Sequence, residues 1–259
     1  MTYDVQLGSG GFSGWKLLEK TQERQQAIFA KDRQIVSAQD YFSKNLPAVQ
    51  KAEYFVKDYK LLSVALRAFG LDADLPNKAY IKKVLESDPS DKTSFVNRIS
   101  DKRYLKLNMA LGFGGSDSTT ATQDSKPILN AYVLRSFEKN IGERYQDIEL
   151  ALNAKRELPE LASSTSSENA KWYQIIASKP LRLVMESALG LSSSFTSLPV
   201  ERQLTEMKTR FSRVMGTDSL AALSNTENLD KLVKTYLIRS QLSSSPSSPR
   251  SVALTLLRS

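Results

Sequence analysis

Apolar residues recur along most of this chain with the three-to-four-residue spacing of an α-helix. The stretch LLSVALRAF at 61–69 is apolar around nearly its whole circumference, which is typical of a buried central helix. Gly70 follows directly and predicts the left-handed residue that ends a helix. Ile81, Val84 and Leu85 then mark one face of an amphipathic helix. Alternating strand patterns are scarce, so the predicted fold class is all-α.

The same spacing predicts helices over most of the remaining chain. The expected ranges are 15–31, 38–47, 50–59, 91–98, 101–111, 127–153, 168–177, 178–189, 199–215, 218–224 and 227–241. No apolar run is long enough to cross a bilayer, so we expect no transmembrane segment and no membrane insertion. The first residues also lack the basic and apolar regions of a cleavable signal peptide.

Two parts of the chain resemble each other at an offset of 120 residues. The sequence LLSVALRAFGL at 61–71 corresponds to LRLVMESALGL at 181–191, with the two glycines in register. A Leu-Pro pair follows each segment, at 75–76 and at 198–199. Since Gly and Pro interrupt helices rather than set their period, two unrelated amphipathic helices would not share them. We therefore predict two tandem homologous helical modules, produced by an internal duplication.

This repeat organises the chain into five parts. We expect a flexible N-terminal lead at 1–14, helical module 1 at 15–111 and helical module 2 at 127–241. Between the modules, residues 112–126 are rich in Gly, Ser and Thr, a composition typical of linkers. A Ser/Pro-rich tail with an apolar end occupies 242–259.

The apolar end of the tail is the candidate partner-binding site. It consists of Val252, Leu254, Leu256 and Leu257, which follow the spacer SSSPSSPR. A spacer that cannot bury itself, followed by apolar side chains, is typical of a tethered docking segment. The alternative is a terminal turn that frays or packs on its own domain.

The composition removes several classes of chemistry. The 259 residues include no Cys and no His, which excludes disulfides, thiolate nucleophiles, Cys/His zinc sites and His-based catalytic triads. No pair of carboxylates has a spacing typical of acid–base catalysis. We therefore expect no catalytic residues, no cofactor and no metal site, and a protein that is not an enzyme.

Two segments resemble ligand-binding loops but miss their defining residues. GSGGFSG at 8–14 is followed by Trp15, where a phosphate loop requires Lys. Asp72 and Asp74 have the spacing of a calcium loop, but Pro76 occupies the next ligand position. We interpret the first segment as a lead into a helix and the second as the charged N-terminus of a helix.

The chain is basic, with 36 Lys and Arg against 28 Asp and Glu, a formal net charge of +8. The basic clusters are Lys78, Lys82 and Lys83, then Lys102, Arg103 and Lys106, and finally Lys208, Arg210 and Arg213. Acidic residues dilute each cluster and no recognition motif accompanies them. We interpret the clusters as solvated helix faces, and nucleic-acid binding remains the alternative.

The segment AFGLDADLPNK, at 68–78, resembles the pattern A-F-G-L-D-x-D-x-x-N-K of an uncharacterised alphaproteobacterial family. The members of that family carry a domain of unknown function and are frequently encoded in flagellar gene clusters. DKRY at 101–104 and the segment 172–182 are also similar to it. The resemblance implies an all-helical, flagellum-associated protein whose partners are flagellar proteins, and it carries over no functional residue.

We therefore expect a non-enzymatic structural or adaptor protein of the flagellum that acts through protein–protein contacts. Its expected location is the cytoplasm or the flagellum itself. The alternative function is a basic nucleic-acid-binding or regulatory protein that controls flagellar expression.

Overall fold

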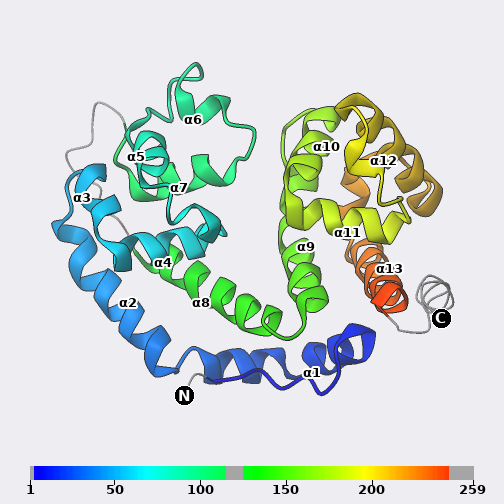
Figure 1. Ribbon diagram of the computed structural model, residues 1–259, viewed down its shortest axis with the longest axis horizontal. Helices are drawn as coiled ribbons and strands as arrows, with labels where there is room; N and C mark the ends of the chain where they lie inside the picture. The colour runs from blue at the N-terminus through cyan, green and yellow to red at the C-terminus, as the bar shows by residue number, and fades with distance from the viewer. Residues whose placement is uncertain (1–2, 115–124, 245–259) are drawn as a thin grey trace, which may run out of the picture. The chain divides into compact units, whose positions relative to one another are not determined.

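The structure, a computed structural model, describes residues 3–114 and 125–244 (Figure 1). All regular structure in these two ranges is helical, with no strand, which confirms the all-α fold class. The α-helices are α1 (Gly11–Phe29), α2 (Arg33–Asn45), α3 (Ala52–Lys57), α4 (Tyr59–Phe69), α5 (Lys78–Glu86), α6 (Phe95–Arg98), α7 (Arg103–Leu111), α8 (Ser125–Gly142), α9 (Gln146–Ser163), α10 (Glu168–Ala177), α11 (Lys179–Leu189), α12 (Val200–Met215) and α13 (Thr226–Ser244). The 3-10 helices are η1 (Leu46–Ala48), η2 (Asp72–Asp74), η3 (Phe195–Ser197) and η4 (Leu220–Ser224).

Most of the expected helices are present, and several differ from the expected ranges in their bounds or type. The single helix expected at 127–153 is wrong, because α8 ends at Gly142 and α9 begins only at Gln146. A β-carbon at Gly142, the last residue of α8, would meet the Glu149 side chain of α9, which would have to shift to accommodate it. The helix expected at 218–224 is the 3-10 helix η4. Helix α2 begins five residues before the expected start at 38, because Asp32 accepts a hydrogen bond from the backbone N–H of Gln34 at 2.8 Å and caps the helix.

The N-terminal segment is fixed by burial and by hydrogen bonds. The side chains of Val5 and Leu7 are 1% and 2% exposed. The expected lead at 1–14 also overlaps α1, whose first turn starts at Gly11. The backbone N–H of Gly11 donates to the Asp147 carboxylate at 2.9 Å, which satisfies one of the open donors at the start of the helix.

The chain forms two compact units. Unit 1 consists of Met1–Val5 and Thr21–Asn140, and unit 2 consists of Gln6–Lys20 and Ile141–Ser259. Nearly all of α8 therefore groups with unit 1, whereas the sequence placed residues from 127 onwards in module 2. The reason is that Ile128 and Leu129 of α8 are buried in the hydrophobic core of unit 1.

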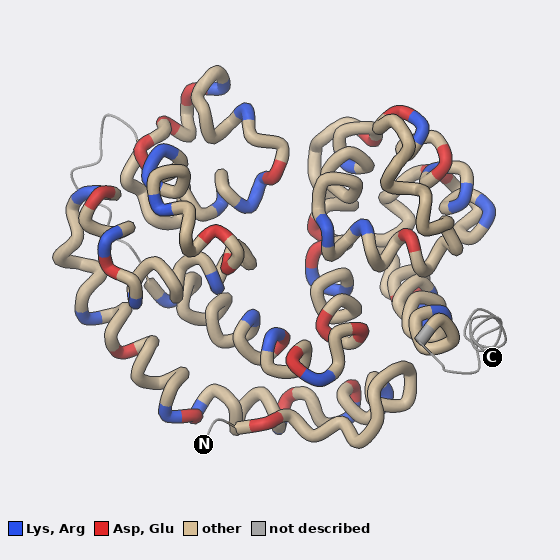
Figure 2. The backbone as a smooth tube through the Cα atoms, in the orientation of Figure 1, with Lys and Arg blue, Asp and Glu red and all other residues tan. Residues whose placement is uncertain are grey.

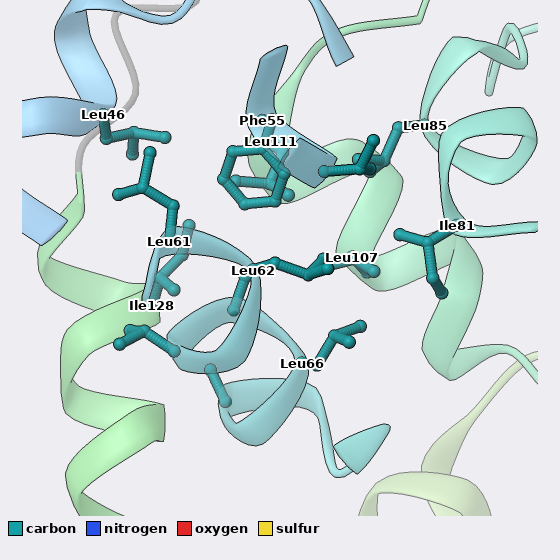
Figure 3. Close-up of a cluster of buried hydrophobic side chains, with 14 of the residues drawn as sticks. Leu46, Phe55, Leu61, Leu62, Leu66, Ile81, Leu85, Leu107, Leu111 and Ile128 are labelled. Carbon is teal, nitrogen blue, oxygen red and sulfur yellow. The ribbon is translucent and has the colours of Figure 1, made fainter. Parts of the chain in front are cut away.

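Helix α4 is the centre of unit 1 and packs against α2, α3 and α7. Six of its eleven residues are buried, as expected for a helix that is apolar nearly all round. Figure 3 shows Leu61, Leu62 and Leu66 of this helix pointing among side chains of the surrounding helices. The partners labelled there are Leu46, Phe55, Ile81, Leu85, Leu107, Leu111 and Ile128.

Helix α11 has the corresponding position in unit 2, where it packs against α9, α10, α12 and α13. Its buried residues are Leu181, Val184, Met185, Ala188 and Leu189. Trp172 of α10 is fully buried in the same unit and packs edge-on against Phe211 of α12, with 5.1 Å between the ring centroids. The Trp172 indole N–H donates to the Asp218 carbonyl at 3.1 Å, so the one polar atom of this side chain is satisfied.

Polar side chains cover the C-terminal carbonyls of several helices. The Asn108 amide of α7 is fully buried and donates to the carbonyls of Val84, Leu85 and Ser87 at the end of α5, at 2.7, 3.2 and 2.8 Å. The Lys171 ammonium donates at 2.8 Å to the Ala162 carbonyl at the end of α9. The last carbonyls of a helix lack the N–H partners of the next turn, so buried donors from neighbouring helices add to the hydrogen bonding there, also at Val84, whose carbonyl accepts from the Ser87 N–H at 3.3 Å as well.

Basic side chains do the same at other helix ends. The donor and acceptor pairs are Lys102 with the Asn97 and Ile99 carbonyls after α6, Arg103 with Gly70 after α4, Arg182 with Ile176 in α10, and Lys231 with Val214 in α12. A positive charge at a helix C-terminus is also favoured by the helix dipole. Part of the basic excess of the chain therefore stabilises its own helices.

The substitution Leu62→Ala should lower the free energy of unfolding by about 2–5 kcal/mol, because it leaves a cavity in a core position that is 0% exposed. The matched control is Met109→Ala, whose side chain is 65% exposed and whose loss should change stability little. Urea denaturation followed by circular dichroism measures both. Equal midpoints for Leu62→Ala and the wild type would contradict this packing.

The substitution Asn108→Leu should destabilise the protein by about 1–3 kcal/mol although it adds apolar surface, because three carbonyls at the end of α5 lose the hydrogen bonds that the Asn108 amide donates. The adjacent exposed change Met109→Leu is the control. A rise in melting temperature for Asn108→Leu would show that these hydrogen bonds do not stabilise α5.

Candidate functional site

A groove in unit 1 is the strongest candidate for a binding site. It lies over helices α2, α4 and α8 and has a volume of about 400 Å³, within the range of known ligand sites. Its lining residues are Arg33, Gln34, Ser37, Ala38, Tyr41, Lys60, Ser63, Val64 and Tyr132. Val64 is buried and Tyr132 half-buried, whereas Arg33 and Lys60 are exposed, so the groove has an apolar floor and a cationic rim.

A second hollow of about 650 Å³ adjoins this groove along α2. Its lining residues are Lys31, Arg33, Val36, Ser37, Asp40, Tyr41, Lys44 and Asn45. Arg33, Ser37 and Tyr41 line both hollows. They are four residues apart and so share one face of α2, which places a continuous ridge between the two hollows. We call the two hollows together the α2 groove.

Hydrogen bonds and a cation–π contact hold the central side chains of the α2 groove in place. The Tyr41 hydroxyl donates to the Asp58 carboxylate at 2.8 Å, and this hydrogen bond raises the pKa of Tyr41. The Lys60 ammonium lies 4.7 Å from the centre of the Tyr41 ring, a favourable cation–π distance. Burial raises the pKa of Tyr132 on the opposite side of the groove. Both tyrosines therefore stay protonated at neutral pH.

The acidic residues beside the α2 groove are mostly engaged in helix caps. Asp32 accepts from the backbone N–H groups of Tyr3 and Gln34, both at 2.8 Å, and these bonds lower its pKa. Asp58 accepts from the N–H groups of Lys60 and Leu61 at 2.9 and 3.0 Å, besides the Tyr41 hydroxyl. These carboxylates are directed to backbone donors and a hydroxyl, not to the side-chain cations.

The basic side chains of the α2 groove have no oppositely charged partner in the described part of the chain. Lys31, Arg33, Lys44 and Lys60 form no ion pair with a carboxylate within the described residues, and all four are exposed. Figure 2 shows basic positions toward both ends of α2. In the sequence, the acidic residue Asp40 lies between Arg33 and Lys44. The surface around α2 therefore has an excess of positive charge that faces solvent.

The two segments that resemble ligand loops are occupied by internal contacts. Asp72 forms an ion pair with Arg67, and Asp74 accepts hydrogen bonds from the Tyr104 hydroxyl at 2.6 Å and from Asn77 at 3.0 Å. At the glycine-rich segment 8–14, the Gly11 N–H that could face a phosphate already binds a carboxylate. Within 3–114 and 125–244, no three acidic side chains converge into a group that could hold a metal ion.

The basic clusters recognised in the sequence are also largely engaged. Lys102 and Arg103 cap helix ends, and Arg103 also pairs with Asp101 at 2.6 Å. Lys83 lies 4.4 Å from the centre of the Phe95 ring. Lys208 pairs with Asp218 at 3.1 Å. The basic side chains of the α2 groove form no such ion pair within the described residues, and the sequence did not identify them as a cluster.

Sequence reasoning missed the α2 groove for a specific reason. The helix expected at 38–47 excluded Arg33 and Ser37, so the shared face of Arg33, Ser37 and Tyr41 was not visible. Asp32, which is a good helix-capping residue three positions before the apolar Ile35, was the available signal. Lys60 and Tyr132 come from other helices, and only tertiary packing brings them to α2.

The expected partner-binding residues Val252, Leu254, Leu256 and Leu257 lie outside the described residues.

Comparison with known families places the chain among proteins of unknown function. Residues 68–229 match the family described as "Protein of unknown function (DUF1217)". The chain belongs to the DUF1217 family. A comparison with curated proteins finds no match.

The fold of this DUF1217 protein is also seen in a crystal structure. An Agrobacterium tumefaciens protein determined by structural genomics is similar with a TM-score of 0.74 and 20% sequence identity. The similarity covers 94% of this chain and 100% of the other. At this level of identity the likeness shows a shared fold. In the described part of the DUF1217 protein, no helix combines the length and the apolar character that crossing a bilayer requires.

The substitution Asp58→Asn should lower the pKa of Tyr41 toward that of an ordinary tyrosine, because the negatively charged acceptor of its hydroxyl proton is removed. Asn retains helix-capping ability, so α4 should persist. A spectrophotometric titration near 295 nm, with Tyr41→Phe used to assign the signal, measures the change. Asp40→Asn, on the same surface but without a bond to Tyr41, is the control. An unchanged Tyr41 titration in Asp58→Asn would contradict the hydrogen bond.

Proposed function

We propose that this DUF1217 protein acts through protein–protein contacts, as an adaptor or minor structural component of the bacterial flagellum. The observation that carries the binding role is the α2 groove, where exposed Arg33 and Lys60 border an apolar floor. The flagellar part of the proposal is supported by the resemblance of 68–78, 101–104 and 172–182 to a family frequently encoded in flagellar gene clusters. The protein would act in the cytoplasm or at the flagellum itself.

The side chains of the α2 groove suit recognition more than turnover. Arg33 and Lys60 supply positive charge, and Ser37, Ser63 and Gln34 supply hydrogen-bonding groups. The Tyr41 hydroxyl donates to Asp58, and this hydrogen bond raises the pKa of Tyr41. Such a set can bind a carboxylate and a neighbouring apolar side chain.

An internal duplication would explain why the two units share a central element. Helices α4 and α11 each have eleven residues and end at a glycine in the left-handed region, Gly70 with φ 68° and Gly190 with φ 64°. A 3-10 helix and then an amphipathic helix follow in both units, as η2 and α5 and as η3 and α12. An arginine side chain also lies beside each glycine, Arg135 in unit 1 and Arg239 in unit 2.

The tail supplies a second candidate contact. Its sequence places Val252, Leu254, Leu256 and Leu257 after a Ser/Pro-rich spacer. We propose that these apolar side chains bind a flagellar partner, since burying each would contribute about 1.5–3 kcal/mol to an interface.

Deleting the gene from a motile strain should abolish or strongly reduce swimming, and expression of the full chain should restore it. A chain that ends at residue 249 should keep the melting temperature of the full protein but fail to restore swimming, because it lacks the apolar end of the tail. Soft-agar expansion and a melting curve measure the two effects. Normal swimming of the deletion strain would refute the flagellar role, whereas full restoration by the shortened chain would refute only the role of the tail.

A further inference from the structure

We infer that the α2 groove binds an acidic segment of a partner protein, in which carboxylates flank an apolar side chain. This inference rests on the proposed protein-binding function and names the chemistry of the partner. It starts from the charge on this surface. Lys31, Arg33, Lys44 and Lys60 face solvent without a carboxylate partner in the described structure, while Asp32 and Asp58 are held by backbone N–H groups.

The α2 groove can also recognise an apolar side chain of the partner, in addition to its negative charge. Ala38, Val64 and the rings of Tyr41 and Tyr132 line it, so an apolar side chain can be buried there. Arg33 on α2 and Lys60 on α4 lie on different helices that border the same hollow. A segment seated over the floor can therefore bring its carboxylates to Arg33 and Lys60, and charge-assisted hydrogen bonds of this type are stronger than neutral ones.

Two other occupants fit the charge of the groove less well. A second copy of this chain carries a net charge of +8, and the chain's own residues 245–259 include Arg250 and Arg258 but no Asp or Glu. Either occupant would therefore be repelled by the positive charge of the groove. An acidic segment of another protein is complementary to it.

A nucleic acid is also a poorer match. The exposed Asp40 carboxylate lies between the basic ends of α2, where a phosphate backbone would have to pass. Base stacking needs an open aromatic face, but the Lys60 ammonium lies over the Tyr41 ring. Tyr132 is half-buried in the groove wall.

The test uses the full-length protein and a fluorescein-labelled synthetic peptide built from Glu-Glu-Leu repeats. Fluorescence anisotropy should show saturable binding that weakens as salt rises, because surface charges are screened. Peptides with Gln-Gln-Leu and Lys-Lys-Leu repeats should not bind. The double variant Arg33→Gln with Lys60→Gln should weaken binding about tenfold or more, since about 1.4 kcal/mol corresponds to tenfold.

The matched control is Lys78→Gln with Lys92→Gln, which removes the same charge from exposed positions of unit 1 that do not line the groove. It should retain wild-type affinity. Ser37→Glu places a carboxylate on the ridge of the groove and should abolish binding. All the substituted residues are exposed, and equal melting curves show that the variants are folded.

Three results would overturn the inference. These are no binding of the acidic peptide at low salt, equal weakening by the groove and control variants, or preferential binding of a single-stranded oligonucleotide that the groove variant abolishes. Swimming assays on the same variants keep this question apart from the proposed function. A groove variant that loses the peptide but swims normally leaves the groove as an acidic-segment site without a flagellar role.

Discussion

The open carbonyls at helix ends are the constraint on which the rest of this structure depends. A chain built from many short helices has many C-terminal turns, and each leaves carbonyl groups without a partner inside its own helix. The protein satisfies them with side chains from neighbouring helices, such as Asn108 at the end of α5, Lys171 at the end of α9 and Arg103 at the end of α4. Each such hydrogen bond joins two helices, so the same bonds cap helix ends and hold neighbouring helices together.

This constraint also determines which charges are available for binding. Lys102, Arg103, Lys171 and Lys231 are used at helix ends, where the helix dipole favours them. The acidic residues Asp32 and Asp58 cap helix N-termini by the complementary rule. The cations around α2, in contrast, remain on the surface of unit 1 without a carboxylate partner in the described structure. The α2 groove is positively charged because the nearby carboxylates of Asp32 and Asp58 cap helices and form no ion pair with its basic side chains.

Apolar burial then fixes the centre of each unit. Helix α4 is apolar on most of its circumference, whereas α11 buries one face of five residues, and each packs against several other helices of its unit. Both end at left-handed glycines, which lets the chain turn sharply into the following 3-10 helix. A binding surface placed on α2 and α4 is thus supported directly by the core, which holds Val64 and Tyr41 in position.

The sequence by itself determined the helical class, the two central helices and the glycines that end them, because these depend on local spacing and on the backbone freedom of single residues. It also determined the absence of Cys and His chemistry. Only the tertiary structure decided that 127–153 is two helices, that α8 groups with unit 1, and that Lys60 and Tyr132 line the same groove as Arg33. The second and third outcomes depend on contacts between residues far apart in the chain, such as Ile128 in the core around α4, and local patterns carry no information about such contacts.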